Sequence, residues 1–211
     1  MKARTATTKP AQPQDDAPVE AILQAAATVF AEHGYSGARV EAIAQAAGIN
    51  KAMLYYRVGA KARLYELVVG TLFDRVARAV EQGRQVQGSP ARQLGAVLER
   101  VAELFRADPR LPRIMAWELA SGGSNMPGAV VRHWGRILQS VAPLAVELGL
   151  DPVLTYFSMV GPMVFISLTE PIRRRFGGEL PEHLRTAASA HAGDMAAFLA
   201  DMIRKAAGEA S

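Results

Sequence analysis

The chain has 211 residues, 50% of them apolar and 21% charged, a composition that excludes an intrinsically disordered protein. It contains no cysteine, which excludes disulfides, thiolate nucleophiles, iron–sulfur clusters and cysteine-bearing zinc sites. The net charge is +4, and this whole excess lies in residues 39–63, where Glu41 is the single acidic residue. Such a concentration of positive charge indicates a surface that binds a polyanion; the alternative is a basic face that is simply solvated.

The N-terminal part of the sequence predicts an arm followed by three helices. Residues 1–16 are basic and have no apolar stretch of the kind a secretory signal needs, so we expect a disordered arm. A helical apolar rhythm runs over 19–33 and ends at Gly34. Two helices of about two turns each are predicted over 40–47 and 51–58, and helices this short must be held by packing.

Longer helices are predicted for the rest of the chain. An amphipathic segment runs from Lys61 to about residue 86, and Ser89-Pro90 is a typical cap and first residue for the helix that ends before Asp108-Pro109. Further helical stretches are expected over 110–121, 127–148, 151–176 and 182–206. Because the alternation typical of strands is absent, we predict an all-α fold of about nine helices.

The most apolar run, Val153 to Leu168, is the candidate for a membrane-spanning helix. It is 16 residues long, whereas a spanning helix needs about 20. We therefore expect a helix that is buried or faces a partner protein, no contact with a membrane, and a cytoplasmic protein.

Residues 40–58, VEAIAQAAGINKAMLYYRV, have the pattern of a helix-turn-helix. Ala44 is small enough for the second helix to cross closely over the first, Gly48 supplies the turn, and Asn50 can cap the second helix. Three apolar side chains would pin the pair to the preceding helix: Ile43, Ile49 and Leu54. The N-terminal part of the second helix in this motif enters the major groove of DNA. The outer face would carry Lys51, Ala52, Met53, Tyr55 and Tyr56, with Arg39 and Lys61 beside it near phosphates.

Residues 20–67 resemble the DNA-binding region of the TetR (tetracycline-repressor-like) regulators. The matching positions are Ile22-Leu23, Ala25-Ala26, Phe30, Gly34-Tyr35, Val40, Ile43-Ala44, Ala47-Gly48, Leu54-Tyr55-Tyr56, Lys61 and Leu64. The resemblance implies phosphate contacts by Asn50, Tyr56, Arg57 and Lys61, and base contacts by Lys51, Ala52, Met53 and Tyr55. The chemistry agrees, because lysine donates to guanine, apolar side chains meet the thymine methyl group, and tyrosine hydroxyls suit phosphates. One of the two tyrosines could instead be a half-buried core residue.

Three short segments depart from the family pattern. Members usually place two Ser or Thr residues where this chain has Ala38-Arg39, so a hydroxyl cap is missing there unless Ser36 replaces it. The usual His-Phe after the two tyrosines is Arg57-Val58, and the usual Ser-Lys-Glu is Ala60-Lys61-Ala62. Two of these changes add positive charge where DNA would lie, and we expect them to alter sequence preference and salt dependence without abolishing binding.

The resemblance also implies a helix-turn-helix domain over 17–62 and a helical effector-binding and dimerisation domain over 63–211. The last two helices are the expected homodimer interface, with burial inside one subunit as the alternative. Candidate pocket residues are aromatic, methionine or isolated polar: Phe105, Met115, Trp117, Glu118, Met126, His133, Trp134, Tyr156, Met159, Met163 and Phe165. Each could also be plain core, and Glu118 and His133 could be surface residues or members of ion pairs.

Catalytic and metal-binding patterns are weak in this sequence. His191 and Asp194 are three residues apart and His183 lies upstream, but no third strong ligand converges by spacing, so we expect no metal and no cofactor. The motifs of hydrolases, zinc proteases and phosphate-binding loops are absent, so we expect no enzyme.

The sequence therefore predicts a homodimeric, ligand-responsive transcriptional regulator. It would be a repressor that releases a palindromic double-stranded DNA operator when a small apolar effector binds. The alternative is a helical small-molecule-binding protein whose head no longer engages DNA, an interpretation that Ala38-Arg39 and Ala60 keep open. A helical enzyme ranks third.

Overall fold

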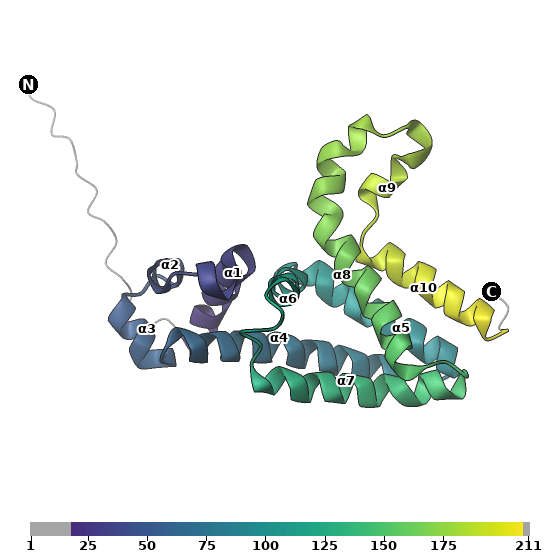
Figure 1. Cartoon of the computed structure of the whole chain (residues 1–211), viewed down its shortest axis with the longest axis horizontal. Helices are drawn as coiled ribbons and strands as arrows, with labels where there is room; N and C mark the ends of the chain where they lie inside the picture. Colours follow the sequence, from purple (N-terminus) through teal and green to yellow (C-terminus); the bar gives the residue numbers. More distant parts are fainter. Residues whose placement is uncertain (1–17, 209–211) are drawn as a thin grey trace, which may run out of the picture.

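The computed structural model describes residues 18–208, without the side chains of residues 184 and 187. Over these residues the chain forms ten α-helices and two short 3₁₀ helices, and no strand occurs among them. The molecule is elongated, with the N-terminal helices at one end and the C-terminal helices at the other (Figure 1). The all-α prediction is confirmed, whereas the predicted arm over residues 1–16 lies outside the described part of the chain.

Three helices form the head, by which we mean residues 18–60. They are α1 (Val19–Gly37), α2 (Val40–Ala46) and α3 (Lys51–Val58). The helices share one apolar centre, in which Ile22, Phe30 and Leu54 are fully buried. The predicted stop at Gly34 corresponds to a break inside α1, because Gly34 has a φ of 65° and a ψ of 179°.

A long helix, α4 (Lys61–Arg84), connects the head to the body, by which we mean residues 61–208 (Figure 1). The next helix, α5 (Pro90–Ala107), packs back against α4. The two backbones come close at Gly83, where an added Cβ would lie 2.6 Å from the backbone of Val97. A glycine at this position therefore allows the tight α4–α5 packing.

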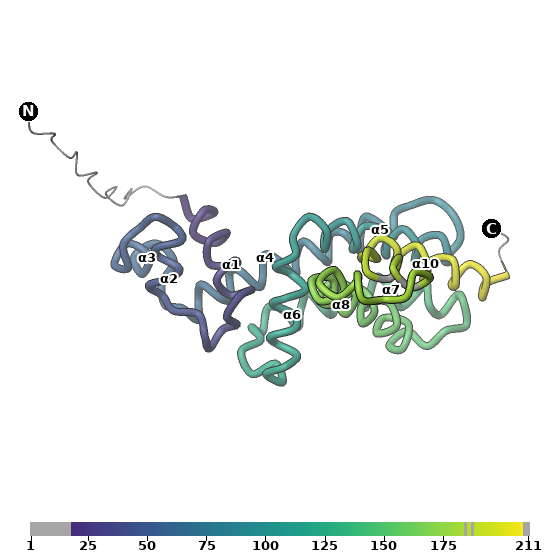
Figure 2. Tube along the Cα trace, turned by 90° about the horizontal axis from the view of Figure 1, so that it is seen from above, coloured from purple at the N-terminus to yellow at the C-terminus, as the bar shows by residue number. Residues whose placement is uncertain are grey.

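Four further long helices complete the body. They are α6 (Arg110–Ala120), α7 (Gly128–Glu147), α8 (Pro152–Phe176) and α10 (Ala192–Ala206). α7 packs on α4, and α5 packs on both α4 and α10. α6 lies between the head and α8, in contact with both α1 and α8 (Figure 2). α6 and α4 are therefore the parts of the body that contact the head helix α1.

The helix predicted over 182–206 is divided. The segment contains η2 (Glu182–Leu184), α9 (Thr186–Ser189) and α10, and it follows the 3₁₀ turn η1 (Gly177–Glu179). Ala190 has extended backbone angles and separates α9 from α10. α10 then begins with a capping box, in which the His191 ring accepts a hydrogen bond from the Gly193 N–H and the Asp194 carboxylate accepts one from the His191 N–H. The prediction of about nine helices holds, with the four-residue α9 as the addition.

The apolar helix α8 is longer than the 16-residue run seen in the sequence. The helical stretch Pro152–Glu179, which comprises α8 and η1, is long and apolar enough, by length and composition alone, to cross a membrane; core helices of other proteins pass the same test. Only 22% of its most apolar window is buried, so most of α8 is not subunit core. Its large exposed apolar side chains are Val153, Leu154, Phe157, Phe165, Ile172 and Phe176.

Candidate nucleic-acid interface and apolar cavity

The turn between α2 and α3 has the geometry that the sequence predicts. Gly48 has a φ of 69°, in the left-handed region that favours glycine, and the Ile49 N–H donates to the Ala44 carbonyl at 3.0 Å. Asn50 caps α3, because its side-chain oxygen accepts a hydrogen bond from the Met53 N–H at 2.8 Å. Ala44 and the three pinning residues Ile43, Ile49 and Leu54 are all buried. The two helices are therefore fixed relative to each other and to α1.

The start of α2 lacks a side-chain cap, as the departure at Ala38-Arg39 predicts. Arg39 is the N-cap residue, and its side chain accepts no hydrogen bond from the first turn. Ala38 is buried and Ser36 does not replace the missing hydroxyl cap. α2 is therefore stabilised by packing and by Glu41, an acidic residue in its first turn whose negative charge interacts favourably with the helix dipole.

The outer face of α3 is open to solvent. Tyr56 is 86% exposed and Tyr55 is 43% exposed, so neither tyrosine is a core residue. Lys51 and Ala52 are exposed, while Met53, Arg57 and Lys61 are half-buried. The residues predicted to contact phosphates and bases from Asn50 onward thus lie on α3 and at the start of α4. No other element in the described part of the chain covers them.

Two of the candidate lysines have partners within the head. The Lys51 ammonium lies 2.5 Å from a carboxylate oxygen of Glu41 and 5.9 Å from the centre of the Tyr55 ring. The Lys61 ammonium lies 4.6 Å from the centre of the Tyr35 ring, in cation–π range. Glu41 and Tyr35 were not predicted as site residues, although the single acidic residue in a basic segment was a visible signal.

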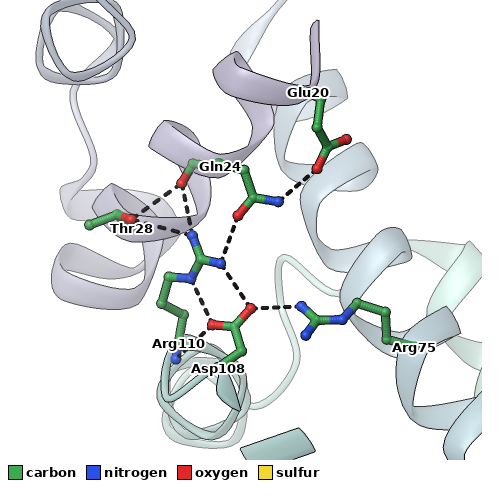
Figure 3. Close-up of polar contacts among 6 residues, drawn as sticks. All are labelled: Glu20, Gln24, Thr28, Arg75, Asp108 and Arg110. Atoms are coloured by element: carbon green, nitrogen blue, oxygen red, sulfur yellow. Dashed lines mark hydrogen bonds and ion pairs between the residues drawn. The ribbon is translucent and has the colours of Figure 1, made fainter.

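The head is fastened to the body by a partly buried ion-pair network centred on Asp108 (Figure 3). Asp108, between α5 and α6, is 4% exposed, and its carboxylate accepts hydrogen bonds from Arg75 of α4 at 2.7 Å and from Arg110 of α6 at 2.7 and 2.8 Å. Arg110 also donates to the backbone and side-chain oxygens of Gln24 in α1, at 3.1 and 2.7 Å. Burial alone would raise the pKa of Asp108, but the hydrogen bonds from Arg110 and Arg75 outweigh it and hold that pKa below its usual value.

α6 makes two more polar contacts, one to the head and one to α4. The Trp117 indole N–H donates to the Ala31 carbonyl of α1 at 3.2 Å. Glu118 is buried and accepts a hydrogen bond from the hydroxyl of Tyr65 in α4, a group whose pKa is raised by burial and then by this bond. Trp117 and Glu118, both candidate pocket residues, therefore contact α1 and α4 and do not line the cavity of the body.

An apolar cavity of about 50 Å³ lies inside the body, between α4, α5, α6, α7 and α8. Its lining consists of Phe73, Val76, Val80, Val97, Leu98, Val101, Phe105, Met115, Ile137, Val141, Tyr156, Met159, Val160 and Met163. Five of the candidate pocket residues are among them: Phe105, Met115, Tyr156, Met159 and Met163. The Tyr156 hydroxyl is the one oxygen or nitrogen that these side chains offer, and burial raises its pKa. The other nine lining residues, from α4, α5, α7 and α8, were missed, since nothing in the sequence distinguishes an apolar residue that lines a cavity from one in the core.

The remaining pocket candidates lie outside this lining. Met126 packs against the core from the loop before α7. His133 lies 3.9 Å from Asp74, which pairs with Arg136 at 3.1 Å, so His133 lies beside an ion pair that joins α4 and α7. Trp134 lies 6.2 Å from the ring of Tyr156, and the two form an aromatic cluster with Phe157. Phe165, also named as a candidate, is 69% exposed on α8.

Metal-ligating side chains do not gather in the described residues: no group of three or more His, Asp or Glu that could hold a metal ion occurs there. His191 and Asp194 are accounted for by the cap of α10.

Residues 22–68, which comprise most of the head and the first two turns of α4, match a family model described as bacterial regulatory proteins of the tetR family. A curated relative, the HTH-type transcriptional repressor SCO4008 of Streptomyces coelicolor, is 28% identical over 124 residues. That match covers 57% of this chain and 60% of the relative, so the chain spans little more than half of that relative's length.

Solved structures share the fold over nearly the whole chain. The transcriptional regulator FadR of Bacillus subtilis, in complex with stearoyl-CoA, superposes with a TM-score of 0.68 over 88% of this chain and 97% of its own, at 16% identity. AibR, in complex with isovaleryl coenzyme A and operator DNA, superposes with a TM-score of 0.63 over 87% of this chain and 96% of its own, at 19% identity.

Proposed function

We propose that this chain, a member of the TetR family of bacterial regulatory proteins, is a ligand-responsive DNA-binding transcriptional regulator that represses from a palindromic operator. The observation that carries the proposal is the exposed face of α3, which is capped by Asn50 and lies within residues 39–63, the segment that holds the basic excess of the chain. A short helix with an open N-terminal half is the element that enters a major groove. A cytoplasmic location would follow, because the proposed partner is DNA.

The proposed contacts divide by chemistry. Tyr56 and Arg57, with Lys61 and the N-terminal end of α3 at Asn50, would hold phosphates; Arg39 lies where α2 would cross the backbone. Lys51, Ala52, Met53 and Tyr55 would face base edges. Phosphate contacts dominate affinity and make it salt-dependent, while base contacts determine which sequence is bound.

The operator-binding form would be a homodimer held through α8 and α10. Both helices carry exposed large apolar side chains, among them Phe165 at 69% and Phe198 at 60% exposure. α8 and α10 contact each other, so these side chains belong to one region of the body. Two heads related by a twofold axis would read the two half-sites of a palindrome. We therefore propose that an identical subunit covers this face.

Replacing Phe165 by glutamate is expected to convert the dimer to monomer, because it places a charge in the proposed apolar interface. Sedimentation velocity would measure the mass, which should fall from twice to once 22.6 kDa. The matched control is Leu119→Glu on α6, which is 73% exposed and lies outside both interface helices; this variant should stay dimeric. A wild-type monomer, or a dimeric Phe165→Glu variant, would contradict the proposed interface.

The apolar cavity is the proposed effector site. At about 50 Å³ it is smaller than the roughly 300–1,000 Å³ of typical ligand pockets, so an effector would bind only after the helices move apart. FadR and AibR are solved with acyl-CoA molecules, and we propose that an effector of this chain likewise places an apolar tail among Phe105, Met115 and the α8 residues. The Tyr156 hydroxyl would orient its one buried polar group.

Release of DNA would follow from the way the cavity adjoins the head–body junction. Phe105 lines the cavity three residues before Asp108, and Met115 lines it two residues before Trp117. Asp108, through Arg110, and Trp117 both connect to α1. An effector that displaces Phe105 or Met115 would therefore displace α1. Such an effector shifts the population toward the DNA-free conformer only if it binds that conformer more tightly than the DNA-binding one.

The test is fluorescence anisotropy on a duplex selected by the wild-type protein from a random pool, over a series of salt concentrations. We expect saturable binding with a steep salt slope, and addition of long-chain acyl-CoA should weaken it. The Arg57→Ala, Lys61→Ala double variant should lose about 0.9 of slope for each contact removed. A charge-matched control, Arg92→Ala with Arg100→Ala on α5, should keep the slope, because both side chains are exposed on the body. Failure to select any sequence would favour a small-molecule-binding protein without DNA binding.

A further inference from the structure

The ion pair between Glu41 and Lys51 joins the two helices of the helix-turn-helix across their outer face. Glu41 lies in the first turn of α2 and Lys51 is the first residue of α3. The Lys51 ammonium is 2.5 Å from the Glu41 carboxylate and 5.9 Å from the Tyr55 ring centre, so it is held between a carboxylate and an aromatic face. Both charged side chains remain at least half exposed, at 50% and 63%, and can meet DNA.

We propose that Glu41 is a specificity-determining residue: it positions Lys51 to read guanine and prevents that lysine from strengthening binding to DNA of any sequence. This inference rests on the proposed function, since it concerns how the same head distinguishes one duplex from another.

The first part follows from the number of donors on an ammonium group. Lysine has three N–H donors, and the bond to Glu41 uses one of them. Two donors remain for the O6 and N7 acceptors that guanine presents in the major groove. Because the carboxylate fixes the end of an otherwise flexible side chain, less conformational freedom is lost when Lys51 meets guanine. At a base without these acceptors, the Glu41–Lys51 pair loses its water and gains no hydrogen bond to the base in exchange.

The second part follows from charge. Glu41 is the single acidic residue within 39–63, and α2 is the helix that crosses the phosphate backbone in this motif. If Lys51 left Glu41 for a phosphate, it would expose an unpaired carboxylate to the polyanion. Sequence-independent binding therefore gains little from Lys51, because its charge is already neutralised within the head.

The experiment compares the wild type with Glu41→Gln, Lys51→Gln and the double variant. Each is measured on the duplex selected by the wild type and on a scrambled duplex of equal length, between about 50 and 200 mM salt. Glu41→Gln should tighten binding to scrambled DNA by roughly 3- to 10-fold and steepen its salt slope by about 0.9 per head, because Lys51 becomes available to a phosphate. The ratio of the two affinities should fall by about 10-fold. Lys51→Gln should weaken binding to the selected duplex and leave the slope on scrambled DNA unchanged.

Two comparisons separate this effect from simple removal of a negative charge. In the Lys51→Gln background, Glu41→Gln should no longer change the slope. Glu32→Gln removes the same charge from an exposed residue of α1 and should leave both duplexes bound as by the wild type. A slope change that persists without Lys51, or that Glu32→Gln reproduces, would overturn the inference. A wild-type protein that selects no sequence would instead overturn the proposed function, so the two failures are distinguishable.

Discussion

Replacing Gly34 by alanine is expected to lower the free energy of unfolding by about 2–5 kcal/mol. Gly34 has a φ of 65° and a ψ of 179°, a backbone conformation that only glycine adopts without strain. An added Cβ would also lie 2.9 Å from the Trp117 ring, whose indole N–H is bonded to Ala31 of the same helix. The ring cannot move away without losing that bond, so strain and steric overlap act together.

Gly48→Ala is a comparison in which a positive φ occurs without steric overlap. Gly48 also has a positive φ, of 69°, but nothing lies within 4 Å of an added Cβ. We expect Gly48→Ala to lower the free energy of unfolding by about 1–2 kcal/mol, the cost of holding alanine in the left-handed conformation. Urea unfolding followed by circular dichroism would measure both variants. An equal loss of unfolding free energy in the two variants would show that overlap with the Trp117 ring carries no cost. That result would contradict the steric part of the prediction for Gly34→Ala.

The head could be predicted from the sequence because its decisive features are local. Gly48 supplies the turn, Asn50 caps a helix whose first residue follows it, and Ala44 allows a crossing within the same motif. Each of these functions depends on residues within about six positions of one another. The missing cap at Arg39 could be predicted for the same reason.

The junction and the cavity could not be predicted in this way, because they join residues far apart in the chain. Trp117 and Glu118 have the residue types of a pocket, but their partners Ala31 and Tyr65 precede them by 86 and 53 positions. Asp108 reads as the end of a helix before a proline, and nothing in the sequence indicates that Arg75 and Arg110 converge on it. The packing of helices against one another determines such contacts. The periodicity of apolar residues shows only which face of a helix is buried, not what it is buried against.

The exposure of α8 has a related explanation. Apolar residues occur nearly all round this helix, and a sequence of that kind predicts burial without saying by which molecule. The structure buries a minority of its apolar window within the subunit. The remainder, including Phe165 and Ile172, is the surface that we propose a second subunit covers.

Asp108→Asn is expected to destabilise the protein by about 2–4 kcal/mol at neutral pH. The substitution keeps the shape of the side chain but removes the charge that Arg75 and Arg110 share, and leaves two partly buried guanidinium groups without a carboxylate. Because Arg110 also bonds Gln24 of α1, loss of this pair should loosen the head from the body. A control, Asp201→Asn on α10, removes the same charge from a half-exposed carboxylate that pairs with the more exposed Arg204 and Lys205, and it should change stability less.

The pH dependence of this difference identifies its cause. The folded pKa of Asp108 lies below its ordinary value of about 3.9, so the folded state binds the proton less readily than the unfolded chain. The stabilisation is therefore fully present above about pH 5 and is lost as the pH falls through the folded pKa. Asparagine does not titrate, so the gap in unfolding free energy between wild type and Asp108→Asn should be constant from neutral pH down to about pH 5 and should narrow below about pH 4. Urea unfolding at a series of pH values would measure it. A gap that stays constant through the acid range would mean that the variant acts by altered packing and that the Asp108 charge does not hold the head.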